Sequence, residues 1–118
     1  MSNDEIKRIN TILYCRNWDE TVKFYRDVLK FPVHYEAKWL VEFQLIESTF
    51  LSIANAAFTT IQSAKGSGIT LSIQVENVDI TYRRLCGIGI KTGPIKAIWG
   101  ARAFYIFDPE GHRIELWS

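Results

Sequence analysis

The chain has 118 residues, the length of one domain, and a net charge of +1 at pH 7. Its lysine and arginine residues are not clustered, which excludes the electrostatic pattern of a nucleic-acid-binding protein. No apolar run reaches the roughly 18 residues of a membrane-spanning helix, and the N-terminal segment MSNDEIKR carries charges of both signs, unlike a secretory signal. Cys15 and Cys86 lie in apolar patterns typical of reduced, buried thiols. We therefore expect a cytoplasmic protein with no membrane or nucleic-acid partner.

The first half of the chain predicts a strand at residues 9–15 and a helix at residues 18–29. Asn17 is a candidate N-cap, and Glu20, three residues later, completes a capping box. Apolar residues recur through the predicted helix at helical spacing and form a single stripe. Stretches of strand composition follow the helix at 33–38, 40–45 and 50–54.

The second half repeats this order after a segment of small and polar residues, 55–68, which has the composition of a linker. It predicts a strand at 69–75 and then a helix at 78–86 that begins at Asn77 and ends at Gly87. Strand stretches follow at 90–98, 103–107 and 113–117. The pattern Asn-apolar-Asp-x-Thr starts at both Asn17 and Asn77, sixty positions apart. We therefore expect an α+β fold in a single domain, 1–118, built from two βαβββ modules at about 7–54 and 69–118.

One carboxylate near the C-terminus requires a partner. Asp108-Pro109-Glu110-Gly111 has the residues of a tight turn between the last two predicted strands. Beyond this turn, Glu115 stands in an otherwise apolar strand, where a carboxylate is costly to bury alone. A metal, a basic side chain, a polar ligand or water would each satisfy it.

Strand alternation assigns the side chains of each predicted sheet to two faces, and the apolar sets belong under the helices. The other face is half polar and carries aromatic rings. Its members are Asn10, Tyr14, Ser52, Thr70, Gln74, Glu115 and Trp117. A sheet with one side in solvent gives the same alternation. The number of rings favours a ligand cavity or an interface over plain solvent.

Two motifs resemble those of the glyoxalase / bleomycin-resistance / dioxygenase superfamily, also called the vicinal oxygen chelate proteins. The first is Trp18-x6-Tyr25-Arg26-Asp27-Val28-Leu29-Lys30-Phe31, with Lys30 where the family often has glycine. The second is Trp99-Gly100-x-Arg102 followed by Phe107-Asp108-Pro109-x-Gly111-x-x-Ile114-Glu115. The resemblance covers essentially the whole chain. It implies paired βαβββ modules with mixed sheets curled around a cavity, usually in a homodimer, with the pairing either within one chain or exchanged between two.

The resemblance also implies where a divalent metal would be held, by one side chain from each of four strands. Those positions fall on Asn10, Ser52, Thr70 and Glu115, and only Glu115 is a good ligand. Neither histidine completes the set, because His34 is expected near the rim and His112 is expected to face solvent from its turn. We therefore expect no cofactor, with a divalent metal as the alternative.

Three functions remain open, of which a binding module ranks first. It would hold a small apolar or aromatic molecule in an aromatic-lined cavity. The predicted ligand-binding residues are Tyr14, Trp39, Phe43, Gln74, Trp99, Arg102, Tyr105 and Trp117. The second hypothesis is a lyase, isomerase or dioxygenase, either metal-dependent or with Glu115 as a general base. The third is a domain whose exposed sheet face serves only dimerisation.

Overall fold

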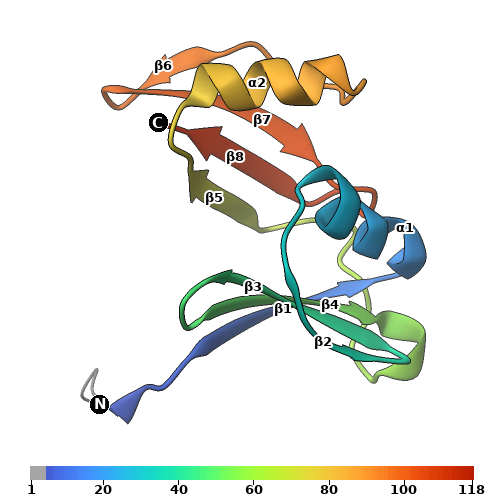
Figure 1. Ribbon diagram of the computed structural model, residues 1–118. Helices are drawn as coiled ribbons and strands as arrows, with labels where there is room; N and C mark the ends of the chain where they lie inside the picture. Colours follow the sequence, from blue (N-terminus) through green and yellow to red (C-terminus); the bar gives the residue numbers. More distant parts are fainter. Residues whose placement is uncertain (1–4) are drawn as a thin grey trace. The chain divides into compact units, whose positions relative to one another are not determined.

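The computed structural model describes residues 5–118, which divide into two compact units, one ending at Lys65 and one spanning Gly66–Ser118 (Figure 1). Each unit contains one four-stranded mixed sheet and a helical segment between its first two strands. The predicted α+β fold of two βαβββ modules is therefore confirmed. No helix within residues 5–118 is long and apolar enough to cross a bilayer.

In the first unit, the strand order across the sheet is β1-β4-β3-β2. β1 pairs in parallel with β4, and the other pairs are antiparallel, because only the β1-to-β2 connection passes through a helix. Its elements are β1 (Ile9–Cys15), α1 (Trp18–Lys23), the π-helix η2 (Phe24–Val28), β2 (Val33–Ala37), β3 (Leu40–Ile46), β4 (Thr49–Asn55) and the short 3-10 helix η3 (Ala56–Phe58).

The core of the first unit forms between the helical segment and one face of this sheet. Tyr25 is fully buried, and its ring lies 5.9 Å from that of Phe31 and 6.2 Å from that of Phe43. Trp18 donates its indole N–H to the backbone carbonyl of Ile53 at 2.8 Å. Leu51 and Ile53 of β4 are buried, so the apolar alternation of the sequence does mark the face under the helix.

The helical start and register differ from the sequence prediction. The side chain of Asn17 makes no capping hydrogen bond, and its backbone carbonyl instead accepts the hydroxyl of Thr21 at 2.7 Å. The predicted single helix is α1 followed by η2, in which the N–H of Leu29 donates to the carbonyl of Phe24, five residues back. The capping box predicted at Asn17 is therefore wrong, because the Asn17 side chain accepts no backbone N–H of the first turn.

Lys30, just beyond this helix, has φ 60°. An L-residue in the left-handed region costs about 1 kcal/mol relative to glycine. Lys30→Gly should therefore raise the free energy of unfolding by about 0.5–1 kcal/mol, measured by urea denaturation. Lys38→Gly is the control, because Lys38 lies in a turn and is not among the residues with positive φ. A loss of stability in Lys30→Gly would contradict the expectation.

The second unit repeats the topology with the strand order β5-β8-β7-β6 and a parallel β5–β8 pair. Asn77 caps its helix as predicted, accepting from the N–H of Ile80 at 3.1 Å. The ring of Tyr82 meets Phe104 edge-on at 5.1 Å and joins the helix to the sheet. The elements are β5 (Thr70–Gln74), α2 (Val78–Gly87), β6 (Lys96–Ile98), β7 (Ala101–Phe107) and β8 (Arg113–Trp117).

Two boundaries in this unit were predicted wrongly. Gly87 is the last helical residue rather than the residue that ends the helix, and the left-handed position is Gly89, with φ 86°. The strand expected at 90–98 is limited to 96–98, because the segment before it contains Gly93-Pro94 and Pro94 lacks a backbone donor.

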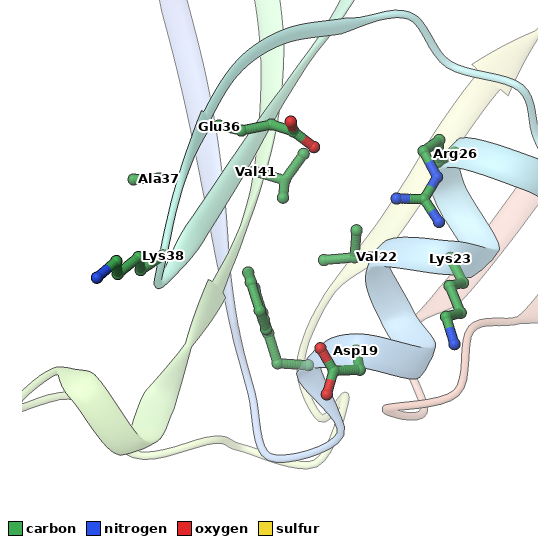
Figure 2. Close-up of a pocket in the computed structure, with 9 residues that line it drawn as sticks. Asp19, Val22, Lys23, Arg26, Glu36, Ala37, Lys38 and Val41 are labelled. Carbon is green, nitrogen blue, oxygen red and sulfur yellow. The ribbon is translucent and has the colours of Figure 1, made fainter.

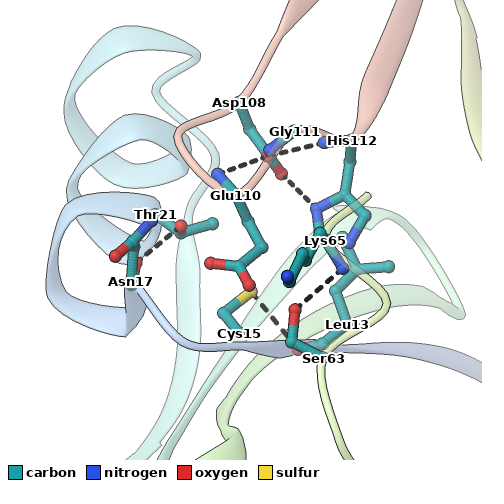
Figure 3. A network of polar contacts seen from close by, with 10 residues as sticks. All are labelled: Leu13, Cys15, Asn17, Thr21, Ser63, Lys65, Asp108, Glu110, Gly111 and His112. Carbon is teal, nitrogen blue, oxygen red and sulfur yellow. Dashed lines mark hydrogen bonds and ion pairs between the residues drawn. The ribbon is translucent and has the colours of Figure 1, made fainter. Parts of the chain in front are cut away.

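The turn between β7 and β8 is organised by Asp108 (Figure 3). One carboxylate oxygen, Oδ1, accepts the backbone N–H groups of Glu110, Gly111 and His112, each at 2.9 Å. The other, Oδ2, pairs with Nδ1 of His112 at 2.7 Å. The side chains of Asp108 and His112 are 0% and 7% exposed. His112 therefore does not face solvent as expected, because Asp108 satisfies the imidazole inside the turn.

Candidate functional site

The sheet face opposite the helix in the first unit carries a polar network centred on Glu42. The carboxylate of Glu42 accepts from Arg8 Nη2 at 2.7 Å and from Asn10 Nδ2 at 3.3 Å, and it lies 2.7 Å from Nδ1 of His34. Ser52 donates its hydroxyl to Oδ1 of Asn10 at 2.9 Å. The network therefore joins all four strands of this sheet through side chains alone.

The corresponding face of the second unit is centred on Glu115, which is half-buried. Register places Glu115 between Ser72 of β5 and Tyr105 of β7. Ser72 donates its hydroxyl to one carboxylate oxygen at 2.6 Å, and Tyr105 donates to the other at 2.9 Å. Two neutral hydroxyl groups thus hold the carboxylate in place, and they leave its negative charge uncompensated by a direct ion pair.

The pKa of Tyr105 is raised above its usual value, first because the Glu115 carboxylate accepts a hydrogen bond from the phenol, then by burial and by the charge of Glu115, while Arg113 acts in the opposite direction. Glu115→Gln removes that charge, so the pKa of Tyr105 should fall toward its ordinary value. Ultraviolet titration of tyrosinate checks this when each protein is compared with its own Tyr105→Phe variant. An unchanged pKa would show that Glu115 is not the cause.

A cavity of about 250 Å³ opens beside Glu115 in the second unit. Its lining is Ser72, Ile98, Trp99, Ala101, Ala103, Glu115 and Trp117. Ala101 and Ala103 contribute small side chains to the lining, while the indoles of Trp99 and Trp117 contribute flat apolar surface. Among residues 5–118, Glu115 is the only charged side chain in the lining.

Trp99 is held in an unusual conformation at this cavity. It is fully exposed and has φ 52°, followed by Gly100 with φ 79°, in the turn between β6 and β7. A two-residue hairpin with positive φ at both central positions normally has asparagine, aspartate or glycine first. A bulky ring that is both exposed and held in a strained backbone conformation makes Trp99 a candidate binding residue.

The structure brings together four of the predicted site residues: Trp99, Tyr105, Glu115 and Trp117. Gln74 is the register partner of Trp117 and shares its face, but it does not line the cavity. In the first unit, Tyr14 is half-buried on β1, and Trp39 lies 41% exposed in the turn between β2 and β3.

Two predicted ligand-binding residues lie elsewhere. Phe43 is fully buried against Tyr25, on the helix side of β3, because alternation places it opposite Glu42. Arg102 forms an ion pair with Asp79 of α2, on the helix side of β7. Phe43 thus belongs to the core and Arg102 to a surface ion pair. Neither residue lines the cavity beside Glu115, which corrects the prediction.

The sequence reasoning missed Glu42, although the argument used for Glu115 applies to it equally. Glu42 also stands in a mostly apolar strand, and it is 8% exposed in the fold. His34, expected at a rim, instead pairs with Glu42. The available signal was the alternation of β3, in which Glu42 points to the same side as the register partner Ser52.

The four positions that the family resemblance assigns to a metal do not fit one. Ser52 donates to Asn10, and the hydroxyl of Thr70 accepts from Arg113 Nε at 3.0 Å. Glu115 is the one carboxylate among the four, and it is engaged by two hydroxyl groups. Within residues 5–118, no three His, Cys, Asp or Glu side chains converge to hold an ion.

Two further hollows lie in the first unit, away from the predicted site residues. A groove of about 490 Å³ runs between α1 and the β2–β3 hairpin (Figure 2), and it carries both acidic and basic side chains, including Asp19, Lys23 and Glu36. A hollow of about 620 Å³ lies along the segment after β4 and includes Arg16 and Lys65. Their mixed or solvated linings lack the convergent aromatic and polar groups of a small-molecule site.

Comparison with known proteins agrees with this architecture. A family model described as a glyoxalase-like domain matches residues 8–118. A glyoxalase family protein from Enterococcus faecalis is similar in structure at 26% identity over 100% of both chains, with a TM-score of 0.73. Lactoylglutathione lyase from Agrobacterium tumefaciens is 20% identical over 92% of this chain and 90% of that one, with a TM-score of 0.77.

TnmS3, an antibiotic binding protein from Streptomyces sp. CB03234, is 19% identical over 92% of each chain, with a TM-score of 0.77. No curated protein matches the chain in sequence. The two βαβββ modules are the fold that this chain shares with these structures. The chain belongs to the glyoxalase-like domain family.

Proposed function

We propose that the protein binds a small, flat, apolar or aromatic molecule at the cavity beside Glu115. The observation that carries the proposal is Trp99, a fully exposed indole held at positive φ over a cavity that also contains Trp117. A ligand stacked on these rings would cover apolar surface that is otherwise in water.

The charge of the cavity narrows the ligand class. Glu115 is the only charged residue that the described part of the chain contributes to its lining, and its carboxylate is held there by hydroxyl groups rather than by a cation. A ligand with a positive charge or a strong hydrogen-bond donor would satisfy the carboxylate while its rings contact tryptophan. TnmS3, which has a similar fold, is described as an antibiotic binding protein.

The test compares proflavine, a flat aromatic cation, with acridine at a pH where acridine is neutral. The wild type should bind proflavine more tightly, measured by fluorescence titration and by a rise in the unfolding temperature. Trp99→Ala should weaken binding by about tenfold or more. Trp39→Ala is the matched control, since it also removes an exposed indole but outside the cavity. Equal loss in both variants would overturn the proposed site.

An enzymatic alternative rests on the placement of Glu115 as a general base beside a hydrogen-bonded phenol. The variant Glu115→Gln discriminates an enzyme from a binding protein, because an enzyme would lose turnover while a binding protein would lose only affinity for cations.

We further propose that the protein is a cytoplasmic homodimer. Size-exclusion chromatography with mass detection should then show two chains per particle.

A further inference from the structure

The first unit holds a carboxylate–imidazole pair that the proposed function does not use. Glu42 is 8% exposed, and its carboxylate contacts both Arg8 and His34 at 2.7 Å. Burial of an ionised group at this depth is costly unless the charge is paired and hydrogen-bonded. The three donors of the network meet this requirement, so the arrangement is well satisfied on the carboxylate side.

The imidazole, in contrast, is satisfied on one side only. Because a carboxylate accepts hydrogen bonds, the proton of the pair is placed on Nδ1 of His34, which makes Nε2 an acceptor whenever the ring is neutral. No group within residues 5–118 bonds to Nε2, and the His34 side chain is 44% exposed. Glu42 therefore determines the tautomer of a partly exposed ring, and Nε2 is left to interact with a ligand.

The ring is also fixed in orientation. Phe50 lies 4.9 Å from the imidazole, and the guanidinium of Arg8 lies 4.0 Å over the same phenyl ring. Asn10 bonds both to Glu42 and to Ser52, which ties the carboxylate to the neighbouring strands. A base positioned by a third group, with little freedom to rotate, is the arrangement that proton transfer requires.

Comparison with His112 shows that pairing with a carboxylate does not by itself indicate a proton-accepting site. His112 also places Nδ1 2.7 Å from a carboxylate, but its side chain is 7% exposed inside a turn, against 44% for His34. The Asp108–His112 pair holds backbone together. The Glu42–His34 pair, in contrast, is made by side chains alone and leaves its imidazole partly exposed.

We propose that His34 is a proton-accepting subsite for a ligand with an acidic hydroxyl group, a phenol or an enol. The proton moves from the ligand oxygen to Nε2, the O–H bond breaks and an N–H bond forms. Glu42 remains ionised and faces the resulting imidazolium. The ligand oxyanion is then stabilised by the imidazolium N–H and by the guanidinium of Arg8, whose Nε and Nη1 make no bond within residues 5–118.

The test uses 4-nitrophenol as the probe, because its ionisation is visible in its absorbance. At a fixed pH near the midpoint of the free probe, the wild type should increase the phenolate band on binding. His34→Gln should lose this increase and weaken binding by about tenfold. Tyr35→Phe, an exposed change on the same strand, should behave as the wild type. Equal spectra in the wild type and His34→Gln would overturn the proposal.

A second measurement needs no variant that might disturb folding. Nitrogen NMR of the wild-type imidazoles should show His34 protonated at Nδ1 and unprotonated at Nε2, and 4-nitrophenol should convert it to imidazolium. The reverse tautomer, or a ring that stays neutral with the probe bound, would overturn the proposal. Trp99→Ala should leave both signals unchanged, so this subsite and the cavity beside Glu115 can fail independently.

Discussion

Gly66→Ala should destabilise the protein by more than about 3 kcal/mol. A Cβ on Gly66 would lie 2.1 Å from the carbonyl carbon of Gly111 and 2.6 Å from the backbone N of His112. Both neighbours are backbone atoms of the Asp108 turn, so no flexible side chain can move aside. Gly66 also has φ 84°, which adds the cost of a left-handed alanine.

Gly68→Ala separates these two costs. Gly68 has φ 79°, nearly that of Gly66, but nothing lies within 4 Å of its Cβ position. Its substitution should therefore cost only the backbone term, about 1 kcal/mol. Urea denaturation of both variants measures the difference, which reports the clash alone. Equal destabilisation would mean that Gly66 does not pack against the turn.

Asp108→Ala is expected to be the second severe change, at about 3–5 kcal/mol. It removes the acceptor of three backbone N–H groups and the partner of His112 in one step. Asp108 and His112 are nearly buried, so water does not readily replace these bonds. The loss would appear in chemical denaturation and as faster hydrogen exchange at Glu110 and Gly111.

Asp108→Asn is the matched control for this prediction. Its carbonyl oxygen keeps the three backbone bonds, and its amide donates to Nδ1 of the other His112 tautomer. The cost should therefore be about 1 kcal/mol, well below that of alanine. If asparagine were as harmful as alanine, the negative charge rather than the hydrogen-bond geometry would hold the turn.

Several features were predictable because they depend on nearest neighbours along the chain. Asn77 caps α2 with a side chain that reaches three residues ahead, and the apolar alternation of β4 and β8 marks the face under each helix. The placement of Glu115 on the other face followed from the same period of two. Local sequence patterns were therefore sufficient to predict the fold class and the sheet face on which Glu115 lies.

Other features needed partners distant in sequence. Phe43 was predicted to line a cavity, but its ring packs against those of Tyr25 and Phe31 in the core. His112 is buried because Asp108 turns back on it, and Glu42 is satisfied by Arg8, 34 residues earlier. Composition shows that such groups require partners, but strand register decides which partners they find.

The amino-acid sequence by itself determined the duplicated strand–helix–three-strand order and the alternation of each sheet, because these follow from backbone periodicity and local capping. Only the tertiary structure decided which polar side chains meet. It placed Tyr105 and Ser72 on Glu115, and His34 on Glu42. These contacts join residues on separate strands, and their distances depend on register and twist, which no local pattern specifies.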